Sequence, residues 1–87
     1  MELEWDAGAE DTLRRLLLQL DKRDRESHAA RAREAAEVHA RAHGLRTVNA
    51  DAAGVGFVKA ASSVMKPQVK SALRRVGIDP LKYEDFL

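Results

Sequence analysis

The chain has 87 residues, a formal net charge of +1 and no cysteine. A chain of this length supports one domain with a single modest core, and the lack of cysteine excludes disulfides, thiolate metal sites and a cysteine nucleophile. The sequence holds no apolar run near the roughly 20 residues that span a membrane, and its acidic N-terminal stretch is unlike a signal peptide, so we expect a cytoplasmic location.

Only 5% of the residues are aromatic, while alanine and arginine are frequent, a composition that favours closely packed helices. The sequence predicts an all-α fold: residues 1–87 form one small domain, a bundle of four helices with a short extended link and a C-terminal helical turn.

The first helix begins near Asp6, because an aspartate carboxylate can accept hydrogen bonds from the free N–H groups at a helix start. Beyond it, apolar residues recur at the spacing of one helix face; they are Ala9, Leu13, Leu16, Leu17 and Leu20. Trp5 stands just before this helix. We expect its ring to fold back onto the core, since burying an indole is favourable.

The second helix runs from a cap at Asp24 to about His43, and Gly44 ends it, because glycine readily adopts the left-handed backbone that closes a helix. One polar line carries three residues that we expect to form ion pairs at the i, i+4 spacing: Arg33, Glu37 and Arg41. The opposite line, which we expect to face the core, is Ala32, Ala35, Ala36 and His39.

Residues 45–48 predict a short extended link, after which Thr47 or Asn49 caps a third helix. This helix has a face of small residues that permits close contact with another helix: Ala53, Gly56, Ala60 and Ser63. Phe57 and Val64 supply apolar bulk beside that face, so we expect both in the core.

Pro67 begins a fourth helix, because proline suits the first helical position. Gly77 ends it, with Ile78 as the apolar residue that follows such a helix end. Asp79-Pro80 then starts a final turn. The expected core consists of Trp5, Leu13, Leu16, Leu17, Leu20, Ala32, Ala36, His39, Val48, Phe57, Val64, Leu73 and Val76.

Histidines 39 and 43 lie four apart on the second helix, the spacing of two metal-binding histidines. His28, however, lies roughly 16 Å from His39 along the helix, too far to share one ion, and the chain has no HExxH pattern. Gly54-Val55-Gly56 lacks the GK[ST] sequence of a phosphate loop. We find no catalytic constellation, and we expect no enzyme activity, no cofactor and no metal.

Large apolar residues gather in the final turn: Leu81, Tyr83, Phe86 and Leu87. They either cover the domain's own core or anchor a partner protein or a second copy of the chain. These four are the candidate partner-binding residues.

Basic residues form a second candidate set, for contact with nucleic acid: Arg23, Arg25, Lys66, Lys70 and Arg74. The last three follow one edge of the fourth helix. They either track phosphates or are solvated cations on a helix surface.

The order Leu3-x-Trp5-x-x-x-Ala9-x-x-x-Leu13, then Glu37, Ala40-Arg41 and Gly44, then Val48 and Asp51, resembles the small C-terminal domain of the light-independent protochlorophyllide reductase B subunit. The resemblance covers residues 3–58, and residues 59–87 form a C-terminal helical extension. It implies a non-enzymatic accessory module that associates with a nitrogenase-like or other electron-transfer enzyme and carries no iron–sulfur ligand.

The same stretch also resembles a histone fold, in which a short helix, a long central helix and a short third helix follow one another. Arg46-Thr47-Val48 and Asp51 occupy the place of the strand link before the third helix. This resemblance implies the alternative function, a histone-like protein that binds nucleic acid through the five basic residues named above.

Overall fold

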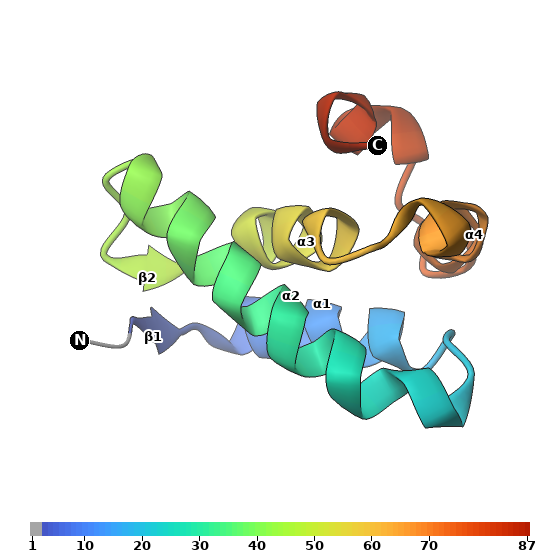
Figure 1. Ribbon diagram of the computed structural model, residues 1–87. Coiled ribbons are helices and arrows are strands. Elements are labelled where there is room, and N and C mark those ends of the chain that lie inside the picture. Colours follow the sequence, from blue (N-terminus) through green and yellow to red (C-terminus); the bar gives the residue numbers. More distant parts are fainter. Residues whose placement is uncertain (1–2) are drawn as a thin grey trace.

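The computed structural model describes residues 3–87, which form a mostly helical globule (Figure 1). Within them the α-helices are Ala7–Leu17 (α1), Lys22–Ala42 (α2), Ala50–Lys59 (α3) and Lys66–Arg75 (α4). Two strands, Glu4–Trp5 (β1) and Thr47–Val48 (β2), and two 3₁₀ segments, Ser63–Met65 (η1) and Pro80–Phe86 (η2), complete the described part of the chain. The predicted mostly helical fold is confirmed.

The helices begin at capping residues. The Asp6 carboxylate accepts a hydrogen bond from the Ala9 N–H at 2.7 Å, as predicted. Asn49, rather than Thr47, caps α3 by accepting from the Ala52 N–H at 2.9 Å. α2 begins at Lys22 behind the cap Asp21, so the predicted cap Asp24 lies inside its first turn.

Both predicted glycine stops are confirmed. Gly44 and Gly77 have φ values of +70° and +84°, in the region where glycine has no side-chain penalty. The residue after each glycine donates a backbone hydrogen bond that closes the helix. The Leu45 N–H donates to the Ala40 carbonyl at 2.9 Å, and the Ile78 N–H donates to the Leu73 carbonyl at 2.8 Å. This is the hydrogen-bond pattern of a Schellman motif.

The predicted extended link is one strand of a small sheet. β2 pairs with β1 in parallel, with Glu4 opposite Thr47 and Trp5 opposite Val48. The all-α prediction omitted this sheet, because the pairing joins two short segments that are distant in the sequence. The Asp6 N–H also donates to the Val48 carbonyl at 3.1 Å, so the sheet holds the start of α1 beside the start of α3.

α3 is the centre of the fold, and residues 52–58 are all buried. Where it crosses α2, a Cβ at Gly56 would overlap the Ala32 carbonyl and the Ala36 side chain. The predicted close contact through small residues is therefore confirmed at Gly56. Ser63 takes no part in it, because α3 ends at Lys59.

The expected core needs corrections at its edges. Val64 was wrongly placed inside: it lies in η1, beyond the end of α3, and 82% of it is exposed. Trp5, Leu17, His39 and Val76 are only half-buried. Buried residues that the prediction missed include Val55, Val58, Val69, Tyr83 and His28.

α2 is the longest helix of the described residues, and charged side chains interrupt it throughout. No helix within residues 3–87 combines the length and the apolar character needed to cross a membrane.

Candidate partner-binding groove

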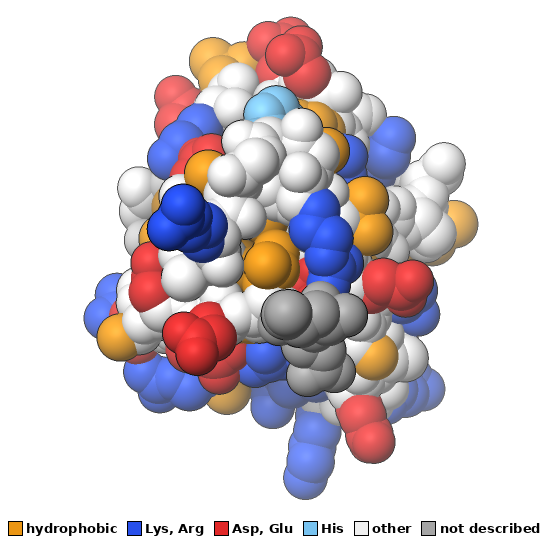
Figure 2. Space-filling model, turned by 90° about the vertical axis from the view of Figure 1, so that its left-hand side faces the viewer, with side chains coloured by type: hydrophobic (Ala, Val, Ile, Leu, Met, Phe, Trp, Pro, Cys, Tyr) orange, Lys and Arg blue, Asp and Glu red, His pale blue; other side chains and the backbone are white. Residues whose placement is uncertain are grey.

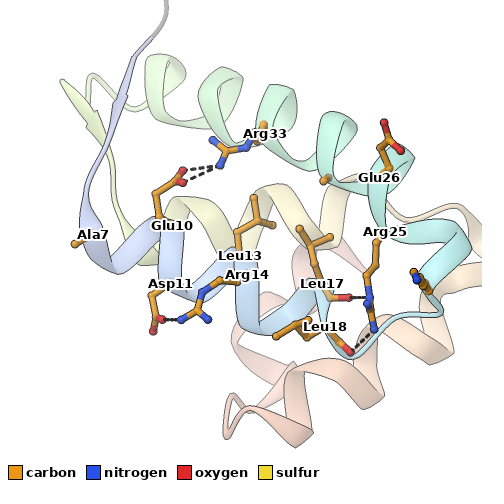
Figure 3. Close-up of a pocket in the computed structure, with 12 residues that line it drawn as sticks. Ala7, Glu10, Asp11, Leu13, Arg14, Leu17, Leu18, Arg25, Glu26 and Arg33 are labelled. Atoms are coloured by element: carbon orange, nitrogen blue, oxygen red, sulfur yellow. Dashed lines mark hydrogen bonds and ion pairs between the residues drawn. The ribbon is translucent and has the colours of Figure 1, made fainter.

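α1 and α2 both pack mainly against α3 and contact each other little, which leaves an open groove between them (Figure 3). This α1–α2 groove has a volume of about 940 Å³. Its apolar lining is Ala7, Leu13, Leu17, Leu18 and Ala29.

Two polar bridges cross the groove, one toward each end (Figure 3). Arg33 of α2 donates through Nη2 to both carboxylate oxygens of Glu10 on α1, at 2.7 and 2.9 Å. At the other end, Arg25 of α2 donates to three carbonyl groups at the end of α1 and in the turn that follows it. They belong to Leu17, Leu18 and Leu20, at 3.1, 3.1 and 3.2 Å respectively.

Leucine side chains lie between these bridges. Leu13 is buried, Leu17 is half-buried, and 53% of Leu18 is exposed. Leu13 and Leu17 lie one turn apart on α1, Leu18 follows at the end of the helix, and together they form an apolar strip that this chain itself covers only in part. Covering such a strip with a partner would remove apolar surface from water, which favours association.

The charges around the groove are distributed unevenly. At the end of the Glu10–Arg33 bridge, Asp11 pairs with Arg14 and with Arg15. At the Leu18 end, two cations, Lys22 and Arg25, and one carboxylate, Glu26, line the groove. The Leu18 end is therefore the more positive one.

The structure separates the four candidate partner-binding residues of the final turn. Tyr83 is only 2% exposed, so of the two alternatives for the final turn this side chain covers the domain's own core and is not presented to a partner. Phe86 and Leu87 are half-buried and pack against the same core. Leu81 alone among the four is well exposed, at 69%.

Two of the five candidate nucleic-acid residues are engaged inside the protein. Arg25 binds the α1 carbonyl groups described above, and Lys66 donates through Nζ to the Leu87 carbonyl at 2.9 Å. Lys70 and Arg74 line a small groove between α4 and η2 together with Asp79 and Glu84.

Arg23, the fifth candidate, is exposed and lies 3.7 Å from the Asp21 carboxylate. The end of the molecule that carries β1 and β2 mixes acidic and basic side chains (Figure 2). The carboxylates of Asp21, Asp79 and Glu84 lie beside three of the five candidate residues, so negative charge interrupts this basic set.

The three histidines also have different roles. His28 is buried, and its Nε2 lies 2.9 Å from the Phe57 carbonyl. The His39 and His43 rings lie against each other with centroids 4.2 Å apart and planes tilted by 40°. Within residues 3–87, no three His, Cys, Asp or Glu side chains come together in a way that could hold a metal ion.

Trp5 and Glu37, two of the residues that carry the first family resemblance, contact each other. The indole Nε1 donates to the Glu37 carboxylate at 3.3 Å, and the Arg33 guanidinium lies 4.5 Å from the centre of the Trp5 ring. Arg33 thereby connects Trp5 with Glu10, so this cluster fixes β1 and α1 against α2.

The sequence prediction did not find the α1–α2 groove. The signal was present in Leu16-Leu17-Leu18, because three consecutive residues of a helix cannot all face one core. Leu16 is buried and Leu18 points away from it.

Comparison of the chain with protein-family models, with curated proteins and with solved structures finds no match in any of the three.

Proposed function

We propose that this chain is a non-enzymatic protein-interaction module whose α1–α2 groove binds an amphipathic helix of a partner protein. The observation that carries the proposal is the half-exposed Leu18 beside Leu17 and Leu13 in an open groove. Two helices that diverge over an apolar floor are a common receptor for a third helix, which buries its apolar face between them.

The bridges limit the length of the apolar strip that a partner can bury. Glu10 and Leu17 are seven residues apart on α1, which is about 10 Å at 1.5 Å per residue. Two turns of a partner helix have that length, so the partner contributes apolar side chains at i, i+3 or i+4, and i+7.

The charges of the groove indicate how the partner helix is oriented. Lys22 at the Leu18 end favours an acidic side chain of the partner there, since Arg25 is held by the carbonyl groups at the end of α1. The acids at the opposite end are already paired with arginines. We therefore propose a partner helix that carries Asp or Glu on the turn adjacent to Lys22.

The resemblance of residues 3–58 to the protochlorophyllide reductase domain supports a class of partner. On that basis, the partner helix belongs to a nitrogenase-like or protochlorophyllide-reductase-like electron-transfer enzyme. Trp5, which carries the resemblance together with Glu37, supports this reading, because it contacts Arg33, which forms one bridge across the groove.

The test is fluorescence anisotropy with a labelled synthetic helix that carries leucines at i, i+4 and i+7 and two glutamates at one end. We expect saturable binding that Leu18→Gln weakens at least several-fold. Val64→Gln is the matched control, because Val64 is an exposed apolar residue far along the chain in η1.

The same helix with lysines in place of the glutamates should bind more weakly. No binding of the acidic helix, or equal loss of binding in the Leu18 and Val64 variants, would overturn the proposal for the groove.

The alternative, histone-like binding of nucleic acid, has less support, because Arg25 and Lys66 are engaged within the protein. A gel shift with duplex DNA at low and moderate salt tests it. Salt-sensitive binding that is lost in Lys70→Ala/Arg74→Ala would favour this alternative over the groove.

A further inference from the structure

The small groove between α4 and η2, which we call the α4–η2 groove, has a volume of about 500 Å³. On the α4 side it is lined by two cations one helical turn apart, Lys70 and Arg74. On the side of residues 79–87 it is lined by two carboxylates, Asp79 and Glu84. The groove therefore has one basic wall and one acidic wall.

The charges of the two walls do not pair with each other inside the protein. All four side chains belong to exposed residues, and none of them takes part in an ion pair within residues 3–87. Asp79 accepts a hydrogen bond from the Leu81 N–H at 3.0 Å and keeps its charge. Both walls therefore present charges that an external surface can neutralise.

Leu81 adds an apolar contact point to the acidic wall. It lines the groove and is 69% exposed, whereas Leu87, which lines the same groove, is half-buried. A single exposed leucine is common on protein surfaces. Leu81 becomes informative because it stands in a groove beside charges of both signs, where a partner that pairs with the charges would also remove its side chain from water.

The groove is held in place at both ends and in the middle. At one end the Ile78 N–H donates to the Leu73 carbonyl at 2.8 Å, and at the other end Lys66 Nζ donates to the Leu87 carbonyl at 2.9 Å. Between them the Tyr83 side chain is buried in the core. A surface that is already ordered loses little conformational freedom when it binds a partner.

We propose that the α4–η2 groove is a self-association surface, at which a second copy of this chain binds to form a two-fold symmetric dimer. A two-fold axis that runs along the groove places the acidic wall of each copy on the basic wall of the other, so the same contact is made twice. Glu84 of each copy then faces Lys70 and Arg74 of the other copy. Leu81 packs on the apolar stems of those two cations.

The charge pattern favours a second copy over other occupants. A wholly acidic or wholly basic partner would meet one wall of its own sign, whereas a surface with opposite charges on its two sides complements itself. The surface is separate from the α1–α2 groove, because no residue lines both. The dimer and the proposed function can therefore fail independently.

Sedimentation equilibrium of the whole chain, from about 10 µM to about 1 mM, tests the dimer. A contact made by one groove belongs to the class of small, transient interfaces, so we expect the mass to rise from monomer toward dimer with a dissociation constant of roughly 0.1 mM. Salt at about 1 M should weaken the association several-fold, because it screens exposed charges. A chain that stays monomeric at the highest concentration would overturn the proposal.

Leu81→Gln should weaken the association at least several-fold. Val64→Gln is the matched control, because Val64 is also an exposed apolar residue and lies outside this groove, and it should leave the association unchanged. Equal losses in these two variants would overturn the proposal. Association that is lost in Leu18→Gln but kept in Leu81→Gln would place the interface at the α1–α2 groove and would also overturn it.

Charge reversal tests the two-fold geometry. Lys70→Glu/Arg74→Glu makes both walls acidic, and Glu84→Lys places a cation opposite the basic wall of the second copy, so each variant alone should be monomeric over the same range. An equal mixture of the two should recover the dimer, because the native acidic wall of the first meets the native basic wall of the second, and the new carboxylates meet the new lysine. Circular dichroism checks that each variant is folded. A mixture of folded variants that stays monomeric would disprove the arrangement.

Discussion

Tyr83 lies directly over Gly54, so closely that the space a Cβ would need at residue 54 is taken by the Tyr83 hydroxyl group and ring. Two features of the sequence that looked unrelated, a glycine within the third helix and a tyrosine in the final turn, are therefore one contact. Gly54 makes room for the one fully buried side chain of η2.

Gly54→Ala should lower the free energy of unfolding by about 1–3 kcal/mol, the usual cost of an overpacked core. Urea unfolding followed by circular dichroism measures it. Gly8→Ala is the control: its Cβ would meet only the Asp6 carboxylate at 3.4 Å and the Ala50 side chain at 3.8 Å, so better helix propensity should raise stability by up to about 1 kcal/mol. A Gly54→Ala protein as stable as the wild type would contradict the close fit.

The alkaline titration of Tyr83 offers a direct optical measurement, because the chain has one tyrosine. Burial raises the pKa of Tyr83 to about 12, and the Asp51 charge and hydrogen bond add to the effect. Because the folded pKa exceeds the ordinary value of 10.0, this contact favours folding below pH 10 and loses its contribution as the pH rises above 10.

Asp51→Asn should therefore lower the midpoint of the absorbance change at 295 nm, since the carboxylate that repels the phenolate is removed. A wild-type midpoint near 10 would show that Tyr83 is solvated.

Arg25 has a structural role that its sequence position does not reveal. Arg25→Ala leaves the carbonyl groups at the end of α1 without their guanidinium partner, and we expect a loss of about 1–2 kcal/mol in the free energy of unfolding. Arg23→Ala is the matched control, because the Arg23 side chain is 84% exposed, and it should change stability by less than about 0.5 kcal/mol. Thermal and urea unfolding compare the two, and equal effects would refute the capping role.

Four of the helix boundaries could be predicted because their causes are local, whereas the start of α2 and the end of α3 were predicted at the wrong residues. Asp6 and Asn49 accept from N–H groups three residues ahead, and Gly44 and Gly77 close helices through hydrogen bonds to residues just behind them. Each of these signals lies within one or two turns of the residues that it positions, so the sequence pattern is sufficient.

The remaining features depend on contacts between distant segments. Nothing local indicates that Trp5 pairs with Val48, or that Arg25 folds back onto the end of α1. The four apolar residues of the final turn also carry no signal that separates the buried Tyr83 from the exposed Leu81. Tyr83 is the residue that becomes buried because Gly54 leaves room for its ring, and that space exists only once α3 has formed.

His28 connects pH to the stability of the core. Its Nε2 donates to the Phe57 carbonyl, and its Nδ1 has no partner among the described residues. Burial lowers the pKa of His28, Arg31 lowers it further, and the hydrogen bond to Phe57 and the charge of Asp24 only partly oppose this.

The unfolded state therefore takes up a proton near the ordinary pKa of 6.5, before the folded state does. Stability should be constant above about pH 7 and fall as the pH drops below 6.5, with a slope of at most about 1.4 kcal/mol per pH unit for one proton. Urea unfolding at a series of pH values from 8 to 5 measures the slope. His28→Gln should be less stable at pH 8 but have a flatter profile, whereas His39→Gln, which alters a half-buried histidine, should retain most of the slope. If the free energy of unfolding of the wild type stayed constant down to pH 5, protonation of His28 would not destabilise the folded state, and the prediction would be wrong.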